Sequence, residues 1–329
     1  MALSFRRSVI SALLIVIAIG GAIAYHAGYI SPVTLFAEHS TPIYPQPAIE
    51  DTIHIVTVAS PDLADRRITA TEGVNIPAGF APDGSLLYVS DRIGRAGLYI
   101  QPMERDAGRL LTDHAGITGH ARVTPDGSAI LFTVAPSLLS SSHRIMRVSL
   151  GGGEPQEVLS GHFLDGGARC ALAPAMLCAI AERQDDGKQV IFSAFNPISG
   201  RGRELARVNG DDFRELRWDL SPDGTRIAVA DARGAQIRIL LIGGPAAEHI
   251  SVSDAYGLGP VSFTSDSRGV IVPRTGGDGT SLLSISLRGD AHLLWEQPGA
   301  TAMAGLASPD GQSVAVWVRT QSPVYLAKQ

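Results

Sequence analysis

The sequence predicts an all-β fold, a six-bladed β-propeller with four-stranded blades, preceded by one N-terminal hydrophobic helix. Three observations support this prediction: a Pro-Asp-Gly turn motif recurs along the chain, short apolar segments follow its copies, and an uncharged apolar run lies within the first 30 residues. Of the 329 residues, 45% are hydrophobic and 18% are charged, which excludes a disordered chain. The 27 basic residues are spread thinly and form no stripe, so we expect no nucleic-acid partner.

The N-terminal segment, residues 1–30, has the features of a membrane anchor. Arg6 and Arg7 precede an apolar run of 16 residues, 9–24. As a helix this run is about 24 Å long, which is short for a hydrocarbon core of about 30 Å, but continuing it to Ile30 reaches a spanning length. The paired arginines predict a cytoplasmic N-terminus, a single-pass inner-membrane anchor and a periplasmic propeller in the cell envelope. The alternative is a signal peptide cleaved after Ala24, because residues 22–24 have the small-x-small form of a cleavage site.

Residues 31–52 are expected to form a linker between this segment and the propeller. Proline is frequent there, above all over residues 41–47, and makes the segment stiff. The propeller is expected over residues 53–329, where no helical period of useful length appears. Membrane contact is therefore expected through the N-terminal segment only.

The turn motif occurs in six copies, two of them degenerate. Intact copies end at Gly84, Gly127, Gly224 and Gly311, residues 263–269 form a looser copy, and residues 172–176 have lost Asp-Gly. Equivalent positions are 43 to 49 residues apart, a period typical of propeller blades, and six such units account for the chain after residue 50. In each turn proline presets φ, Asp accepts a backbone hydrogen bond, and Gly supplies the positive φ that closes the hairpin.

Further strands are expected after each turn. The second strand of the blades is predicted at residues 85–90, 129–134, 226–230, 270–272 and 314–318, and the third at 98–101, 145–148, 190–193, 237–240, 283–287 and 324–327. Polar turns then lead to a fourth strand. The last unit ends after its third strand, so we expect a strand from residues 53–72 to complete the sixth blade beside the strand at 323–328. This closure removes exposed sheet edges.

The motifs also resemble a known repeat. The Pro82-Asp-Gly84 turn, the tyrosine-bearing strand after it, Ser90-Asp-Arg-Ile-Gly94 and Leu98-Tyr-Ile100 are similar to the PD40 repeat of WD40-like, TolB-type propellers, and the resemblance covers residues 53–329. Residues 169–183, 200–206, 218–224 and 294–297 resemble the C-terminal propellers of bacterial, notably acidobacterial, proteins in which the propeller follows a kinase or winged-helix domain. Neither domain occurs in this sequence.

Motifs for catalysis are missing from the sequence. It has no Gly-x-Ser-x-Gly nucleophile elbow, no His-Glu-x-x-His and no Gly-x-Gly-x-x-Gly, and its nine histidines never reach a metal-ligand spacing. We therefore predict a non-catalytic binding or scaffold module without cofactor or metal. The alternatives are a lactonase-like or lyase-like enzyme at the channel mouth, or a sensor propeller derived from a kinase-linked or DNA-binding protein.

Strand alternation places polar residues toward the central channel. Positions three and five before the turn proline face the channel, and positions two and four pack between blades. The charged or titratable residues at the channel positions are His120, Arg122, Arg169, Arg217 and Asp219. They predict a site for a protein partner or a small anionic ligand carrying carboxylate or phosphate. The alternative is a structural set of arginines paired with Asp219 and with carbonyl groups.

Cys170 and Cys178 are the only cysteines, and they lie on the two strands that flank the degenerate turn. Cross-strand partners can form a disulfide, and an exported domain meets an oxidising compartment. The alternative is a pair of small buried apolar side chains.

Overall fold

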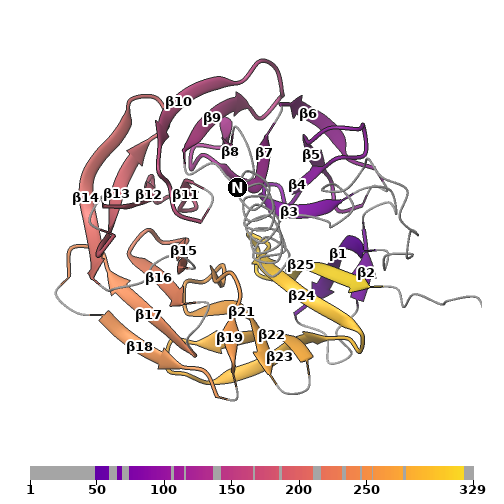
Figure 1. Ribbon diagram of the computed structural model, residues 1–329. Helices are drawn as coiled ribbons and strands as arrows, with labels where there is room; N and C mark the ends of the chain where they lie inside the picture. Colours follow the sequence, from indigo (N-terminus) through magenta and orange to yellow (C-terminus); the bar gives the residue numbers. More distant parts are fainter. Residues whose placement is uncertain are drawn as a thin grey trace, which may run out of the picture. The chain divides into compact units, whose positions relative to one another are not determined.

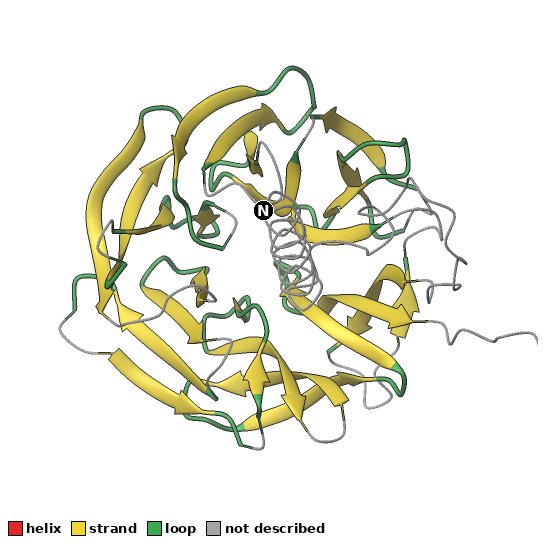
Figure 2. Cartoon of the chain, in the orientation of Figure 1, coloured by secondary structure: helices red, strands yellow, loops and turns green. Residues whose placement is uncertain are grey.

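The structure is a computed structural model that describes residues 49–58, 65–68, 74–104, 107–114, 116–135, 142–165, 167–184, 187–209, 216–231, 235–244, 247–253, 255–276 and 279–321. Six antiparallel sheets follow one another around a ring, which confirms the six-bladed propeller (Figure 1). These residues form strands, turns and loops (Figure 2), and no helix among them is long and apolar enough to cross a membrane. The predicted N-terminal helix and the first part of the linker lie outside the described residues.

Each blade is an up-and-down sheet whose first strand lies nearest the axis. Blades one to three consist of β3 (Asn75–Phe80), β4 (Leu86–Ser90), β5 (Gly97–Gln101) and β6 (Arg109–Asp113); β7 (Ile117–Val123), β8 (Ala129–Val134), β9 (His143–Ser149) and β10 (Gln156–Gly161); and β11 (Arg169–Cys170), β12 (Cys178–Arg183), β13 (Gln189–Asn196) and β14 (Gly200–Asn209).

Blades four and five continue the ring. They consist of β15 (Leu216–Leu220), β16 (Arg226–Asp231), β17 (Gln236–Leu241) and β18 (Ala247–Ser251), and of β19 (Gly257–Leu258), β20 (Ser262–Phe263), β21 (Gly269–Gly276), β22 (Gly279–Ser286) and β23 (Ala291–Glu296). In blade five β19 and β20 both pair with β21, so its innermost strand is interrupted.

The turn motif has the chemistry that the sequence predicts. Gly84 has a φ of 81°, and its N–H donates to the carbonyl of Ala81. The carboxylate of Asp83 accepts the N–H of Ser85 at 2.9 Å. The same bonds recur in the other intact copies, where the equivalent glycines also have positive φ. The motif therefore fixes the hairpin between the first two strands of a blade.

Blade six joins the two ends of the described chain. Its order is β2 (Asp65–Arg67), β1 (Ile49–Thr57), β25 (Ser313–Gln321) and β24 (Ala300–Ala307). The prediction that the beginning of the chain completes the sixth blade is confirmed, but its neighbour differs from the predicted residues 323–328, because β1 occupies the third position and pairs with β25 along its whole length. Residues 49–67 thus supply two strands, and β1 begins inside residues 31–52, which the sequence assigns to the linker. Residues 324–327 lie outside the described part of the chain.

Two contacts explain why β1 takes this place. Ile53 and Val56 of β1 are completely buried. The buried carboxylate of Asp51 accepts hydrogen bonds from the Arg319 guanidinium at 2.8 and 3.0 Å and from the Trp317 indole at 3.1 Å, both from β25. Apolar burial and a paired carboxylate together select this register.

Apolar side chains of the innermost strands pack between blades, as strand alternation predicts. Ala78, Ala121 and Trp218 are buried in clusters that neighbouring blades share. The indole of Trp218 on β15 meets the ring of Phe192 on β13 edge to face, with centroids 5.3 Å apart. The opposite faces of these strands remain for polar side chains.

Candidate functional site

Three consecutive innermost strands, β7, β11 and β15, carry the five polar residues that the sequence predicts at the channel. The strands lie side by side around the inner rim of the ring (Figure 1). Contacts or charge interactions connect all five, and a sixth residue, Asp165, joins them. We call this set the channel cluster: His120, Arg122, Asp165, Arg169, Arg217 and Asp219.

Arg169 lies at the centre of the channel cluster, with 3% of its side chain exposed. Its Nη2 donates to the backbone oxygen of Asp165 at 2.7 Å and to the Oδ2 of the same residue at 3.2 Å. Its Nε is 3.6 Å from Oδ1 of Asp219, and its guanidinium lies over the Trp218 ring. This one side chain therefore bridges two carboxylates and is packed against the core of blade four.

Asp165 is the member of the cluster that the sequence analysis missed. It lies in the loop before β11, where its backbone φ of 44° falls in the left-handed region that Asp tolerates better than most residues. Its Oδ2 accepts the backbone N–H of Trp218 at 3.2 Å, and its Oδ1 is 3.7 Å from Nε of Arg217. Strand alternation does not extend into loops; the only available signal was an Asp-Gly-Gly sequence shortly before Arg169.

Arg122 and Asp219 extend the cluster to further blades. The Nη1 of Arg122 donates to the carbonyls of Ala78 in blade one and of Ala121 in its own strand. Its Nη2 is 4.0 Å from Oδ1 of Asp219, whose Oδ2 accepts the N–H of Phe263 in blade five at 2.9 Å. The cluster thus connects the inner strands of the first five blades.

Burial and mutual charge set the protonation states. Burial, and then the charge of Arg169, lower the pKa of His120 to about 3, so this imidazole is neutral at pH 7. Burial and Arg169 also lower the pKa of Arg122 to about 10, which leaves it a cation. Burial raises the pKa of Asp219 above its usual value.

For Asp165 burial acts in the same direction, but the charges of Arg169 and Arg217 and the hydrogen bond from the N–H of Trp218 outweigh it, and its pKa lies below the usual value. Three guanidinium groups face two carboxyl groups, so positive charge in the cluster exceeds negative charge by at least one.

The contacts within the cluster are incomplete as hydrogen bonds. The distances from Arg122 and Arg169 to Asp219, and from Arg217 to Asp165, are 3.6 to 4.0 Å, longer than a hydrogen bond. The Nε of Arg169 is buried and has no hydrogen-bond acceptor among the described residues. Arg122 and Arg217 keep 18% and 28% of their side chains exposed. An additional acceptor with negative charge fits this arrangement.

No group of three or more His, Cys, Asp and Glu residues in the described part of the chain is arranged to hold a metal ion. The imidazole of His120 is neutral at pH 7, and with a pKa of about 3 it is a weak proton acceptor there.

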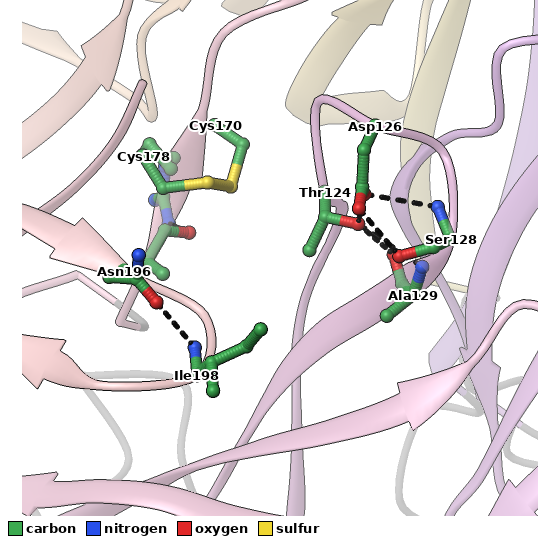
Figure 3. Close-up of a disulfide and its surroundings, with 10 residues drawn as sticks. Thr124, Asp126, Ser128, Ala129, Cys170, Cys178, Asn196 and Ile198 are labelled. Carbon is green, nitrogen blue, oxygen red and sulfur yellow. Dashed lines mark hydrogen bonds between the residues drawn. A yellow bond between two sulfur atoms is a disulfide. The ribbon is translucent and has the colours of Figure 1, made fainter. Parts of the chain in front are cut away.

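Cys170 follows Arg169 directly in β11 and forms a disulfide with Cys178 in β12 (Figure 3). The two cysteines are directly opposite in the antiparallel register, with their Cα atoms 4.0 Å apart. Since β11 has two residues, this bond ties half of the strand that carries Arg169 to the rest of blade three.

No family model and no curated protein matches the sequence, but solved structures match the fold. A TolB protein from Agrobacterium tumefaciens superimposes with a TM-score of 0.61 at 17% identity, over 84% of this chain and 100% of that one. The nidogen/laminin complex gives 0.53 at 12% identity, over 74% and 93%. A puromycin hydrolase gives 0.50 at 17% identity, over 78% of this chain and 45% of the hydrolase.

These identities establish the fold alone: the chain has a TolB-like β-propeller. The same fold occurs in a TolB protein and as part of a hydrolase, so the fold alone does not decide function.

Proposed function

We propose that the chain is a non-catalytic binding module of the cell envelope, attached by its N-terminal segment and placed outside the cytoplasm, and that its channel cluster captures an anionic group. The group is a carboxylate or phosphate, carried by a small ligand or by a protein partner. The single observation behind this proposal is the excess of guanidinium over carboxylate in a largely buried cluster.

The distances between the arginines and the carboxylates favour a ligand site over a cluster whose charges are paired only with one another. In a cluster that serves stability alone, buried arginines pair with carboxylates at hydrogen-bond distance. Here Arg217 approaches its carboxylate only to 3.7 Å and remains the most exposed arginine of the three. Arg217 therefore is the side chain that first meets an incoming anion.

A lactonase-like or lyase-like enzyme is the second candidate, and His120 is the observation in its favour. Its imidazole is neutral at pH 7 and can hydrogen-bond a bound substrate, but a pKa of about 3 makes it a weak general base there. If the chain is an enzyme, His120→Gln should abolish turnover of its substrate. If it is a binding module, its affinity for the anion should survive this substitution.

The binding proposal is tested by measuring the affinity of the purified chain for citrate, inorganic phosphate and a synthetic hexaglutamate peptide by calorimetry. Arg217→Ala should weaken binding of the probe that binds best by at least about tenfold, since a charge-assisted hydrogen bond contributes roughly 1.5–3 kcal/mol. Arg203→Ala is the matched control, because Arg203 is exposed on the outer strand β14. Equal affinity in wild type and Arg217→Ala, or an equal loss in Arg203→Ala, would overturn the proposal.

Placement outside the cytoplasm is tested separately with a reporter fused after Gln329 that is active only in an oxidising compartment. An active fusion supports export, and a fusion that is expressed at full length but inactive contradicts it. The mass of the mature protein separates the uncleaved anchor from a signal peptide removed after Ala24.

A further inference from the structure

The hydrogen-bond donors around the Asp165 carboxylate form a position in which a carboxylate is bound. Oδ2 accepts hydrogen bonds from Nη2 of Arg169 and from the backbone N–H of Trp218, both at 3.2 Å. Oδ1 faces Nε of Arg217 at 3.7 Å. The donors belong to β11 and β15, which are strands of two different blades. Two of them bind Oδ2 and the third faces Oδ1. Such a position suits a planar carboxylate.

Asp165 reaches this position from a loop and not from a strand. Its backbone lies in the left-handed region, with a φ of 44°, whereas the three donors lie on strands held by sheet hydrogen bonds. The donors therefore belong to the blades, whereas the acceptor lies in a connecting segment, in which the N–H of the preceding residue, Leu164, donates to the carbonyl of Ala181 at 2.9 Å. The carboxylate is 6% exposed, but Arg217 beside it is 28% exposed, so the position adjoins solvent on the Arg217 side.

We propose that Asp165 is an internal competitor of the ligand. Its carboxylate fills an anion subsite formed by Arg169, Arg217 and the N–H of Trp218, and the ligand is a carboxylate that binds in this subsite by displacing it. The proposal rests on the anion-binding function above for the existence of the ligand, and it adds the subsite, the class of the ligand and the event that must precede binding.

Substituting the competitor tests the subsite without knowledge of the natural ligand. Asp165→Ala leaves the two guanidinium groups and the N–H of Trp218 without their acceptor, so the variant should unfold at a lower temperature than wild type. Formate or acetate should then occupy the position and raise the Tm of the variant saturably, by about 3 °C at ten times the dissociation constant. Chloride at equal ionic strength should have no such effect.

Two control variants show whether the rise in Tm depends on this subsite. The double variant Asp165→Ala with Arg217→Ala should lose it, because one of the donors is gone. Asp113→Ala removes a carboxylate from an exposed ion pair with Arg95, and formate should not raise its Tm. Rescue that persists in the double variant, or equal rescue of Asp113→Ala, would overturn the subsite.

A second variant keeps the test decisive if Asp165→Ala does not fold. Asp165→Asn retains the shape of the side chain and an acceptor for Trp218 but removes the competing charge. Acetate should bind it at least about tenfold more tightly than wild type, a gain of roughly 1.4 kcal/mol. Asp219→Asn changes the net charge equally without vacating the subsite and should show a smaller gain. Equal gains would mean a general charge effect and would contradict displacement.

Failure of this inference can be distinguished from failure of the proposed function. Anion binding by wild type that Arg217→Ala abolishes, with no gain in Asp165→Asn and no rescue of Asp165→Ala, contradicts the competitor alone. Rescue of Asp165→Ala together with no anion binding by wild type shows that Asp165 is a permanent partner, which contradicts both displacement and the proposed function.

Discussion

At the scale of single residues, Arg169 is the side chain on which the channel cluster depends for stability. It pairs with Asp165 and lies 3.6 Å from Asp219, and both carboxylates are largely buried. Arg169 differs in this from Arg217, which pairs more loosely and is more exposed. We therefore assign Arg169 mainly to holding the blades together and Arg217 mainly to the ligand.

Arg169→Ala should lower the free energy of unfolding by about 3–5 kcal/mol, because it leaves two buried carboxylates without this partner. Denaturant unfolding monitored by tryptophan fluorescence measures the change, with Arg203→Ala as a control that should leave the midpoint unchanged. A loss below about 1 kcal/mol would mean that the cluster does not join the blades.

His120 should make stability depend on pH. The lowered pKa of His120, about 3 against an ordinary 6.5, means that the unfolded chain binds a proton that the folded chain does not bind between these values. Stability contributed by the neutral imidazole is therefore present above about pH 6.5 and is lost on acidification toward pH 3, by up to about 1.4 kcal/mol per pH unit. His120→Gln should reduce this slope between about pH 6.5 and 4.5. An unchanged slope would show that His120 titrates normally.

The residues of the site were predictable to the extent that they lie on strands. Side chains alternate with a period of two, so counting back from a turn proline found His120, Arg122 and Asp219 without any knowledge of the structure. Asp165 follows no period because it lies in a loop, and its position depends on the backbone conformation of that loop. The sequence therefore predicts a single carboxylate beside the three arginines, whereas the structure places two there.

At the scale of elements, β11 is short and is held by few contacts. Two register pairs join it to β12, and one of them is the disulfide pair Cys170 and Cys178. The degenerate turn between these strands lacks the Asp-Gly that closes the other hairpins. The disulfide therefore takes over part of what the turn motif does in the other blades.

Exported protein should contain no free thiol at Cys170 and Cys178, which mass spectrometry with and without reduction measures. Replacing both with Ser should lower the free energy of unfolding by about 2–3 kcal/mol, the chain-entropy estimate for a loop of this size. Alkylation of either cysteine in the folded, unreduced protein would exclude the bond.

Among the elements, the hairpins were the easiest to predict and the last blade the hardest. Pro, Asp and Gly act locally, so every intact motif marks a turn correctly. The strand paired with β25 depends on which distant segment buries its apolar face best, and β1 does so with Ile53, Val56 and the Asp51 carboxylate. Local sequence carries no signal for this choice between segments.

At the scale of the whole propeller, closure of the ring depends on β1 and β2. Both belong to the beginning of the chain, and they complete a blade whose other strands come from its end. Without them β25 becomes an open edge with unpaired backbone groups. Residues 49–67, which form β1 and β2, are therefore needed for the fold.

Deleting residues 1–67 should produce a chain that aggregates, whereas deleting residues 1–48 should leave a monodisperse propeller, because β1 and β2 remain in the second variant and are lost from the first. Size-exclusion chromatography with light scattering distinguishes the two results. A monodisperse folded protein without residues 1–67 would show that blade six closes in another way.

Binding of an anion at the channel cluster can be located by X-ray diffraction from crystals soaked in 4-bromobenzoate, a carboxylate whose ring-bound bromine scatters anomalously and is not displaced by side chains. We expect an anomalous peak beside Arg217 in the wild-type protein and no peak there in Arg217→Ala. A peak of equal height in both proteins, or anomalous density confined to exposed arginines such as Arg203, would contradict capture of an anion by the channel cluster.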